Sequence, residues 1–428
     1  MKRRLILLLI SVISGLIVAE LLFGGVQTFF DIYGPTITVK NSSKYVGLRP
    51  QDFEFKLQDI SGVRRARIQL FQNKRRIDEK NFDLNGEKNT EINYSVDTVG
   101  NRLRQGSYRL VLSAVDQSIR ANRSTVELEF LVDFTRPRII SLTSMHNVRR
   151  GGLELLFYEV VNDASMAECV IPDGKSVFFP GILARAFGIP ARPTVKGALF
   201  SPSVSSDVKR LLLLSYARNF DPYFFRFPQL ILDLKPRRSF IQFSIYEKVL
   251  ELSRRLELES RRYVLEVCEM PATVRQCFID NSFLKPFPKA SYYSTFGQQI
   301  ATQDKNPIFL LEDVFWITAF ESEVISPTKG MVESYDRYTV TLDLGCGLRS
   351  HLYPVENLLV AVGEEVQRGQ LIGTVSRNFA DFTGHRLSLW GVPINPRELE
   401  DFRWVSDHLI SKINFMRSQQ RRGEAPGW

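Results

Sequence analysis

Apolar and polar residues alternate in short runs along much of the chain, and glycine, proline or aspartate ends many of these runs. In Gln51–Asp59 and in Gly106–Asp116 the alternation is typical of β-strands with one buried face. The pattern therefore predicts a mainly β protein. The residues expected to point inward in these two runs are Phe53, Phe55, Leu57, Tyr108, Leu110, Leu112 and Ala114.

Two successive β modules follow from the spacing of the runs. Several short strands in residues 34–137 predict an immunoglobulin-like sandwich, which we expect to be a spacer because it shows no catalytic pattern. Residues 138–244 predict a second, more divergent immunoglobulin-like domain, with Arg238–Ser244 among its strands. His146, beside its first strand, is expected to be a surface or capping residue rather than a ligand.

In Ile245–Val267 the apolar residues recur with the period of an α-helix. Glutamate and arginine fill the face opposite the apolar one. This pattern predicts an amphipathic helix that packs on one side. With the aromatic, proline-broken strap that follows, it makes a connector over residues 245–306. The apolar positions that define the helix are Ile245, Val249, Leu252 and Leu256.

Alternating apolar runs return in residues 307–400, separated by turns that contain glycine. They predict a small all-β module, expected to have two stacked sheets. Residues 401–428 predict one or two C-terminal helices and a basic tail. Trp404, Leu409, Ile410 and Ile413 are the residues expected to pack this part against the core.

The first residues predict a membrane anchor. Lys2, Arg3 and Arg4 precede an apolar stretch that continues to Phe30 with Glu20 as its single charge, long enough to cross a bilayer. A cleaved secretory signal is the alternative, but Ile17–Ala19 is a poor cleavage site. Residues 1–33 are therefore expected to be a cytoplasmic N-terminus and a single transmembrane helix. In a bacterium, the bulk of the chain would lie outside the inner membrane, in the periplasm.

Length and charge narrow the possible partners. With 428 residues the chain has material for several domains. A net charge of +9 favours acidic partners, but the basic residues are scattered. No dense basic run indicates nucleic acid, so none is expected as a partner. Anionic wall polymers and phospholipid headgroups remain compatible with the charge.

The four cysteines leave two possibilities open. Cys268 and Cys277 are close in sequence, so a disulfide could join them in an oxidising compartment, or they could be separate half-buried thiols. The absence of a CxxC sequence disfavours a cysteine zinc site or a thioredoxin-like redox motif.

Four motifs in the last β module carry a resemblance to a known family. They are VISPTKGMV (Val324–Val332), YTVTLDLGCGL (Tyr338–Leu348), LLVAVGEEVQRGQLIG (Leu358–Gly373) and GVPINP (Gly391–Pro396). Their order resembles the β-core of LytM/lysostaphin-type zinc endopeptidases. The resemblance implies a mainly β fold: a transmembrane helix, two immunoglobulin-like sandwiches, a helical connector and a C-terminal LytM-like core of the duplicated hybrid motif type.

The resemblance also implies where zinc ligands and proton-transfer histidines stand in active members. A catalytic zinc takes three protein ligands and keeps a fourth position for water. None of the residues at these positions can serve, so we expect no zinc cofactor and no catalytic residue. The family positions hold Leu311, Phe315, Pro354, Arg386 and Ser388.

Two nearby histidines could substitute only in an unusual way. His351 and His385 are offset by odd numbers of residues from Pro354 and Arg386, so on a strand both should face away from the site. With Asp343 or Asp381 they could still form a non-standard metal site, which keeps an active peptidoglycan metalloendopeptidase as an alternative.

Arg386 has two possible roles. In a peptide-binding groove it could pair with a carboxylate of a peptidoglycan cross-linking peptide. Alternatively it fills the vacated space and pairs with a neighbouring acid.

Three functions therefore remain as hypotheses. The favoured one is a membrane-anchored, catalytically inactive LytM-like protein that binds peptidoglycan or regulates a cell-wall hydrolase, a role implied by resemblance. The others are the active enzyme and a structural envelope scaffold.

Overall fold

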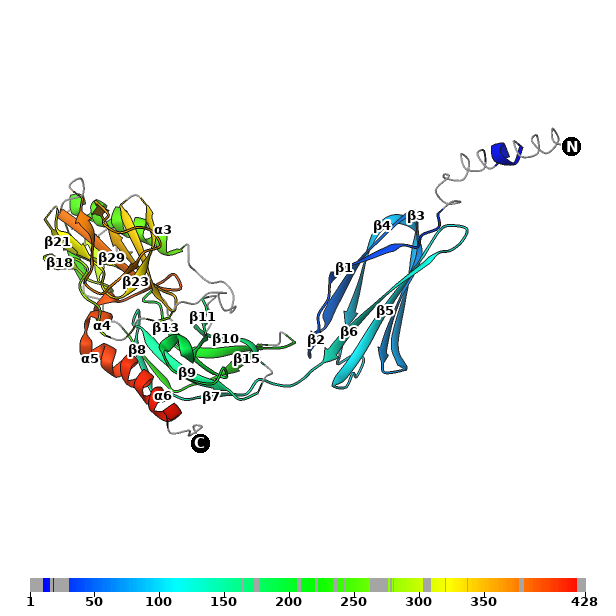
Figure 1. The fold of residues 1–428 in the computed structure, drawn as a ribbon, viewed down its shortest axis with the longest axis horizontal. Helices are drawn as coiled ribbons and strands as arrows, with labels where there is room; N and C mark the ends of the chain where they lie inside the picture. Colours follow the sequence, from blue (N-terminus) through cyan, green and yellow to red (C-terminus); the bar gives the residue numbers. More distant parts are fainter. Residues whose placement is uncertain are drawn as a thin grey trace. The chain divides into compact units, whose positions relative to one another are not determined.

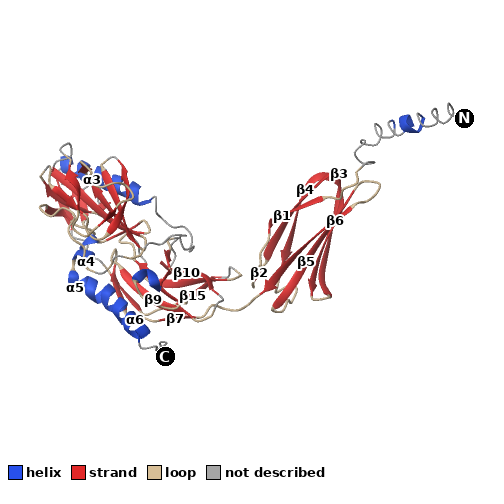
Figure 2. Cartoon of the chain, viewed as in Figure 1, coloured by secondary structure: helices blue, strands red, loops and turns tan. Residues whose placement is uncertain are grey.

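The chain is mainly β, with many sheets and few helices (Figure 2). Its computed structural model forms two compact units, unit 1 (Met1–Arg136 with Ala217–Asp221) and unit 2 (Pro137–Tyr216 with Pro222–Trp428) (Figure 1). The residues that the structure describes are 11–15, 18, 31–162, 165–172, 177–205, 209–219, 222–233, 238–241, 243–261, 276–277, 279, 281–302, 309–319, 321–336, 338–376 and 381–421.

The predicted membrane anchor lies almost entirely outside the described residues, which include only 11–15, 18 and 31–33 of its range. In the part of the chain that is described, no helix combines the length and the apolar character that a bilayer crossing requires.

Unit 1 is a β structure in which strands pair in the order β1-β3-β5-β6-β2, with β4 on the other side of β3. The inward positions predicted for Gln51–Asp59 and Gly106–Asp116 are confirmed, because all seven side chains are buried in one core. The Tyr108 hydroxyl donates to the Arg104 carbonyl at 2.9 Å, which ties the loop before β5 to the core. The strands are β1 (Thr36–Asn41), β2 (Tyr45–Val46), β3 (Gln51–Gln72), β4 (Arg75–Val96), β5 (Gly106–Asp116) and β6 (Arg123–Val132).

The first half of unit 2 contains two four-stranded sheets, β11-β10-β14-β15 and β12-β13-β9-β7, and the parallel pair β16-β8. Its buried residues belong to the same hydrophobic cluster as much of the last β module. The elements are β7 (Ile139–Ser141), β8 (His146–Arg149), β9 (Glu154–Val160), β10 (Ser165–Pro172), β11 (Phe179–Pro180), β12 (Ile182–Leu183), η1 (Ala184–Phe187), β13 (Val195–Phe200), β14 (Leu211–Ala217), β15 (Pro222–Phe225) and β16 (Gln229–Leu232).

The second half of unit 2 is built on an eight-stranded sheet, β18-β21-β29-β25-β24-β23-β27 with β30 on β29, and a smaller sheet β22-β28-β26. The strands are β18 (Ser291–Ser294), β19 (Gln299–Thr302), β20 (Phe309–Leu310), β21 (Val314–Thr318), β22 (Glu323–Ile325), β23 (Gly330–Asp336), β24 (Thr339–Gly345), β25 (Leu348–Tyr353), β26 (Val355–Glu356), β27 (Glu365–Val366), β28 (Leu371–Val375), β29 (Asp381–Leu389) and β30 (Val392–Ile394).

The predicted amphipathic helix is present as α3 (Phe243–Arg261), and its apolar residues Val249, Leu252 and Leu256 are buried. The strand predicted just before it is shorter, β17 (Arg238–Ile241), and pairs with β19 rather than with the sheets of the first half. The predicted boundary at residue 244 therefore falls inside the helix, because the chain joins the second half before that point.

The C-terminal segment forms a run of helices, α4 (Pro396–Glu400), α5 (Phe402–Val405), the π-helical turn η3 (Ser406–Ile410) and α6 (Ser411–Arg421). Leu409 and Ile413 are buried in the main cluster of unit 2, while Trp404 and Ile410 pack partly against it.

A buried group of charges holds these helices to β9. Lys412 Nζ donates to Glu154 Oε1 at 2.6 Å, and His408 Nδ1 lies 3.1 Å from Glu154 Oε2. His146, expected to be a surface or capping residue, is fully buried and contacts Lys412 at 3.1 Å, so the expected surface position was wrong. Burial, with Lys412 beside it, lowers the pKa of His146 to about 4.

A disulfide joins Cys277 to Cys346, with Cα atoms 5.2 Å apart. Both possibilities considered for Cys277, a bond to Cys268 or a free thiol, were therefore wrong. The physical reason is the tight turn at Gly345, where an added Cβ would lie 2.0 Å from the Gln276 carbonyl oxygen. Cys169 is also disulfide-bonded, and Cys268 lies outside the described residues.

We expect the Cys277→Ser/Cys346→Ser protein to unfold more readily, by about 2–4 kcal/mol in the free energy of unfolding, because the bond closes a long loop. Urea unfolding under non-reducing conditions measures the loss. Peptide mapping of the wild-type protein is the companion experiment, and a peptide that links Cys277 to Cys268 would contradict the pairing.

Candidate functional site

Three of the five family positions lie on one face of the large sheet, and the other two lie just outside its strands. β29 lies between β21 and β25, with Phe315 opposite Gly384 and His351 opposite Arg386. Residues directly opposite each other on antiparallel strands point to the same face. Phe315, Arg386 and Ser388 therefore share this face, as the family alignment requires, and Pro354 follows β25 directly, after a cis peptide bond with Tyr353.

Arg386 forms a buried ion pair at the centre of this face. Its Nε donates to Asp313 Oδ1 at 2.5 Å and its Nη2 donates to Asp313 Oδ2 at 2.9 Å. Arg386 is 1% exposed and Asp313 is fully buried. The Ser253 hydroxyl of α3 donates to Asp313 Oδ2 at 2.6 Å, so a third segment completes the group. This bidentate geometry is the strong form of arginine–carboxylate pairing.

Neighbouring carboxylates stabilise the charged form of Arg386. Burial by itself lowers the pKa of the guanidinium, but the Asp313 carboxylate, with Glu312 at 4.0 Å, shifts the pKa above its ordinary value. Arg386 is thus a permanent cation in the protein interior. Of the two roles considered for Arg386, pairing with a neighbouring acid is the one that these contacts describe.

Helix α3 covers the same face. Leu311 and Phe315 pack in one cluster with Val249, Leu252 and Leu256 of the helix. A Cβ on Gly384 would lie 2.9 Å from the Phe315 ring and 3.0 Å from the Leu256 side chain, so glycine at this position lets the helix approach closely. The Arg255 guanidinium also lies 4.9 Å from the centre of the Tyr353 ring. The face that would line a groove is therefore packed against the protein's own helix.

The two histidines lie on opposite faces of the sheet. His351 shares the face of Arg386, and its Nε2 lies 3.2 Å from the Ser388 hydroxyl, so the expectation that it faces away was wrong. Its offset was counted from Pro354, which lies outside β25, whereas the alternation holds only within the strand. His385 does point to the other face, as expected, where it stacks on Trp316 and lies 2.9 Å from Ser350.

Burial lowers the pKa of both imidazoles. Burial, with Arg386 and Arg349 nearby, lowers the pKa of His351 to about 3, and burial alone lowers the pKa of His385 to about 3. Both are neutral at physiological pH. A neutral imidazole can bind a metal, but these two cannot share one ion because the sheet separates them.

The residues present do not fit a zinc ion. Leu311, Phe315 and Pro354 carry no donor atom, Arg386 is positively charged, and the Ser388 hydroxyl is engaged by His351. Asp343, considered as a supporting ligand, accepts from the Gly345 N–H, and the side chain of Asp381 lies outside the described residues. Across the described side chains, the group that brings three acidic or metal-binding residues within 4.8 Å is Asp31, Asp59 and Asp116 of unit 1.

Sequence reasoning missed Asp313 and Ser253. Asp313 lies just before β21, so strand alternation counted from Phe315 could not place it. Ser253 could not be placed either, since its role depends on where α3 packs.

Comparisons with known proteins give structural neighbours at low scores and no match by sequence. No family model and no curated protein matches the chain. M23/LytM-type peptidases are among its structural neighbours. One is a mutant catalytic domain of the prophage-encoded M23 protein EnpA from Enterococcus faecalis, with 12% identity over 26% of this chain and 91% of that one, at a TM-score of 0.22.

Lysostaphin is another such neighbour, with 12% identity over 30% of this chain and 56% of that one, at a TM-score of 0.24. Immunoglobulin-like proteins also appear. An I-band fragment from titin has 12% identity over 50% of this chain and 72% of that one, at a TM-score of 0.23. These scores are low, so membership of the LytM/lysostaphin-type family stays a prediction.

Breaking the buried pair should destabilise the protein strongly. Arg386→Met leaves the Asp313 carboxylate buried without its counter-ion, and we expect a loss of about 3–5 kcal/mol in the free energy of unfolding. The Arg386→Met/Asp313→Leu protein should lose much less than the two single changes combined. Urea unfolding of all three variants measures this.

The exposed pair Arg109–Glu127, at 2.9 Å, supplies the matched control. Arg109→Met should change stability by less than about 1 kcal/mol because the pair is solvated. Equal effects of Arg386→Met and Arg109→Met would show that Arg386 is not buried as described.

Acid should destabilise the protein through His385. Its folded pKa of about 3 is below the ordinary 6.5, so the unfolded chain binds the proton first as the pH falls. The stabilisation is complete above pH 6.5 and decreases toward pH 3, by about 2 kcal/mol between pH 6.5 and pH 5. His385→Gln should remove this part of the pH dependence, as measured by urea unfolding at both pH values.

Ser350→Ala is the control for this experiment, because it removes the hydrogen-bond partner of His385 without removing a titratable group. It should keep the acid dependence of the wild-type protein. An unchanged pH dependence in His385→Gln would contradict the assignment.

Proposed function

We propose that the chain is a catalytically inactive LytM-like protein of the bacterial cell envelope that binds peptidoglycan or regulates a cell-wall hydrolase. The observation that supports this most directly is the buried Arg386–Asp313 pair, because the resemblance places Arg386 at a proton-transfer histidine position beside the metal-ligand positions. A fixed guanidinium repels a divalent cation and cannot act as a proton acceptor. The five family positions therefore offer no group to activate water.

The place of action in this proposal comes from the sequence. The basic N-terminus and the apolar stretch after it support a single-pass anchor in the inner membrane, with units 1 and 2 on the periplasmic side. The net charge of +9 suits anionic wall material. Because the basic residues are scattered along the chain, we expect no nucleic-acid partner.

Binding would use a surface other than the face of Arg386, because α3 packs against that face. The same observation favours a second candidate, a structural envelope scaffold. Arg386 was the polar group expected to contact a wall peptide, and it is 1% exposed.

The inactive protein should carry no stoichiometric zinc. We expect elemental analysis of the purified full-length protein to give well under one zinc per chain, and glycyl-peptide hydrolysis to match the buffer rate. An active family member serves as the positive control. Stoichiometric zinc together with cleavage that EDTA abolishes would overturn the proposal in favour of the metalloendopeptidase.

Wall binding and regulation are then separated from scaffolding by two further measurements. Full-length protein should co-sediment with purified sacculi, or it should change the rate at which a cell-wall hydrolase of the same organism releases sacculus fragments. Arg386→Ala is unsuitable as a surface probe because the residue is buried. A protein that does neither supports the scaffold.

A further inference from the structure

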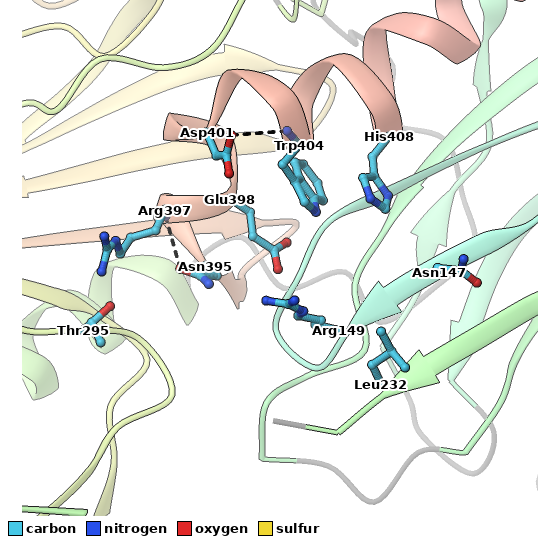
Figure 3. Close-up of a pocket in the computed structure, with 10 residues that line it drawn as sticks. All are labelled: Asn147, Arg149, Leu232, Thr295, Asn395, Arg397, Glu398, Asp401, Trp404 and His408. Atoms are coloured by element: carbon cyan, nitrogen blue, oxygen red, sulfur yellow. Dashed lines mark hydrogen bonds between the residues drawn. The ribbon is translucent and has the colours of Figure 1, made fainter. Parts of the chain in front are cut away.

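Unit 2 contains a pocket of about 500 Å³ away from the face of Arg386. Strand β8, the loop at Thr295 and the segment from α4 to η3 supply its walls (Figure 3). The volume lies within the range of small-molecule sites, and pockets of this kind favour junctions between substructures. None of the three functions above assigns it a role.

The pocket is polar on one side, where two arginines and two acidic residues line it. Arg149 and Arg397 both line it, and Figure 3 shows the Arg149 guanidinium directed into it below Glu398. Arg149 interacts electrostatically with Glu398 and Arg397 with Glu400, but among the described residues no carboxylate oxygen is recorded within 4.0 Å of either guanidinium. Arg397 lies 4.6 Å from the centre of the Tyr292 ring, a stacking that leaves the N–H edge of the guanidinium available.

The acidic groups of the pocket are already engaged. Asp401 Oδ1 accepts from the backbone N–H of Arg403 at 2.9 Å and of Trp404 at 3.4 Å, the second of which Figure 3 marks. Glu398 accepts from the Leu153 N–H at 3.2 Å, and burial raises the pKa of Glu398 to about 7. Near neutral pH Glu398 is partly protonated, so its average negative charge in the pocket is reduced.

One wall of the pocket is aromatic. The Trp404 and His408 rings stack with centroids 4.7 Å apart and planes inclined by 10°. Stacking fixes the indole, which presents a flat apolar surface and an N–H donor. The pocket therefore combines an anion-binding side with an apolar wall.

We propose that this pocket binds a small carboxylate-bearing ligand, with the carboxylate on Arg149 and the apolar part of the ligand against Trp404. Charge-assisted arginine–carboxylate bonds of this kind are directional and strong. The site goes beyond the proposed function, because it does not depend on whether the LytM-like site is inactive. The carboxylate could belong to a peptide C-terminus or to a sugar acid.

The test titrates full-length protein with three probes by isothermal calorimetry and ligand-observed NMR. N-acetyl-alanyl-alanine carries a free C-terminal carboxylate, its C-terminal amide has the same size without the charge, and glucuronate supplies the sugar acid. Binding of the peptide acid or of glucuronate, with the amide at least about tenfold weaker, is the expected result, and the stronger of the two identifies the source.

Variants locate the binding. Arg149→Gln should weaken binding of the preferred acid by about tenfold or more. Arg150→Gln is the matched control, since Arg150 is the next residue, pairs with Asp233 at 2.6 Å and does not line the pocket. Thermal unfolding confirms that each variant is folded.

Three results would overturn the proposal. They are the absence of binding by both acids, equal binding of the peptide acid and its amide, and equal effects of Arg149→Gln and Arg150→Gln. The zinc and hydrolysis measurements test the proposed function separately, so failure of one leaves the other standing.

Discussion

The arrangement of the second half of unit 2 depends on one buried cation. A guanidinium in the interior is tolerated only with a well-placed counter-ion and further hydrogen bonds. Arg386 on β29 therefore requires the Asp313 carboxylate just before β21, and the carboxylate in turn receives the Ser253 hydroxyl from α3. Two strands and a helix are fixed to one another by this requirement, because any other packing would leave a charge unpaired.

Two apolar residues near the ion pair also need to be covered. Leu311 and Phe315 would be unfavourable if they were exposed to water. The Leu256 side of α3 covers them, and Gly384 leaves room for it to do so. The buried ion pair and the covering helix are thus two aspects of one packing arrangement.

The sequence predicted local order well and long-range pairing poorly. Strand β5 and helix α3 were found from their periods, and the parity of Arg386 and Ser388 put them on one face. The pairing of Cys277 was not found, because Cys346 approaches it only through a turn 69 residues further along the chain. His351 was misplaced because alternation was counted across the end of β25. Such errors arise wherever position depends on register or on packing between distant segments.

Buried charges join distant segments a second time in unit 2, where Glu154 on β9 holds Lys412 and His408 of the C-terminal helices. Burial lowers the pKa of Lys412, and the Glu154 carboxylate opposes that shift, so the pair keeps the helices docked as long as both charges persist. The pocket of Arg149 lies beside this junction and shares His408 with it. The wall that the C-terminal helices supply is therefore fixed by tertiary contacts. Such a wall is preformed, and a preformed pocket loses little conformational entropy when a ligand binds.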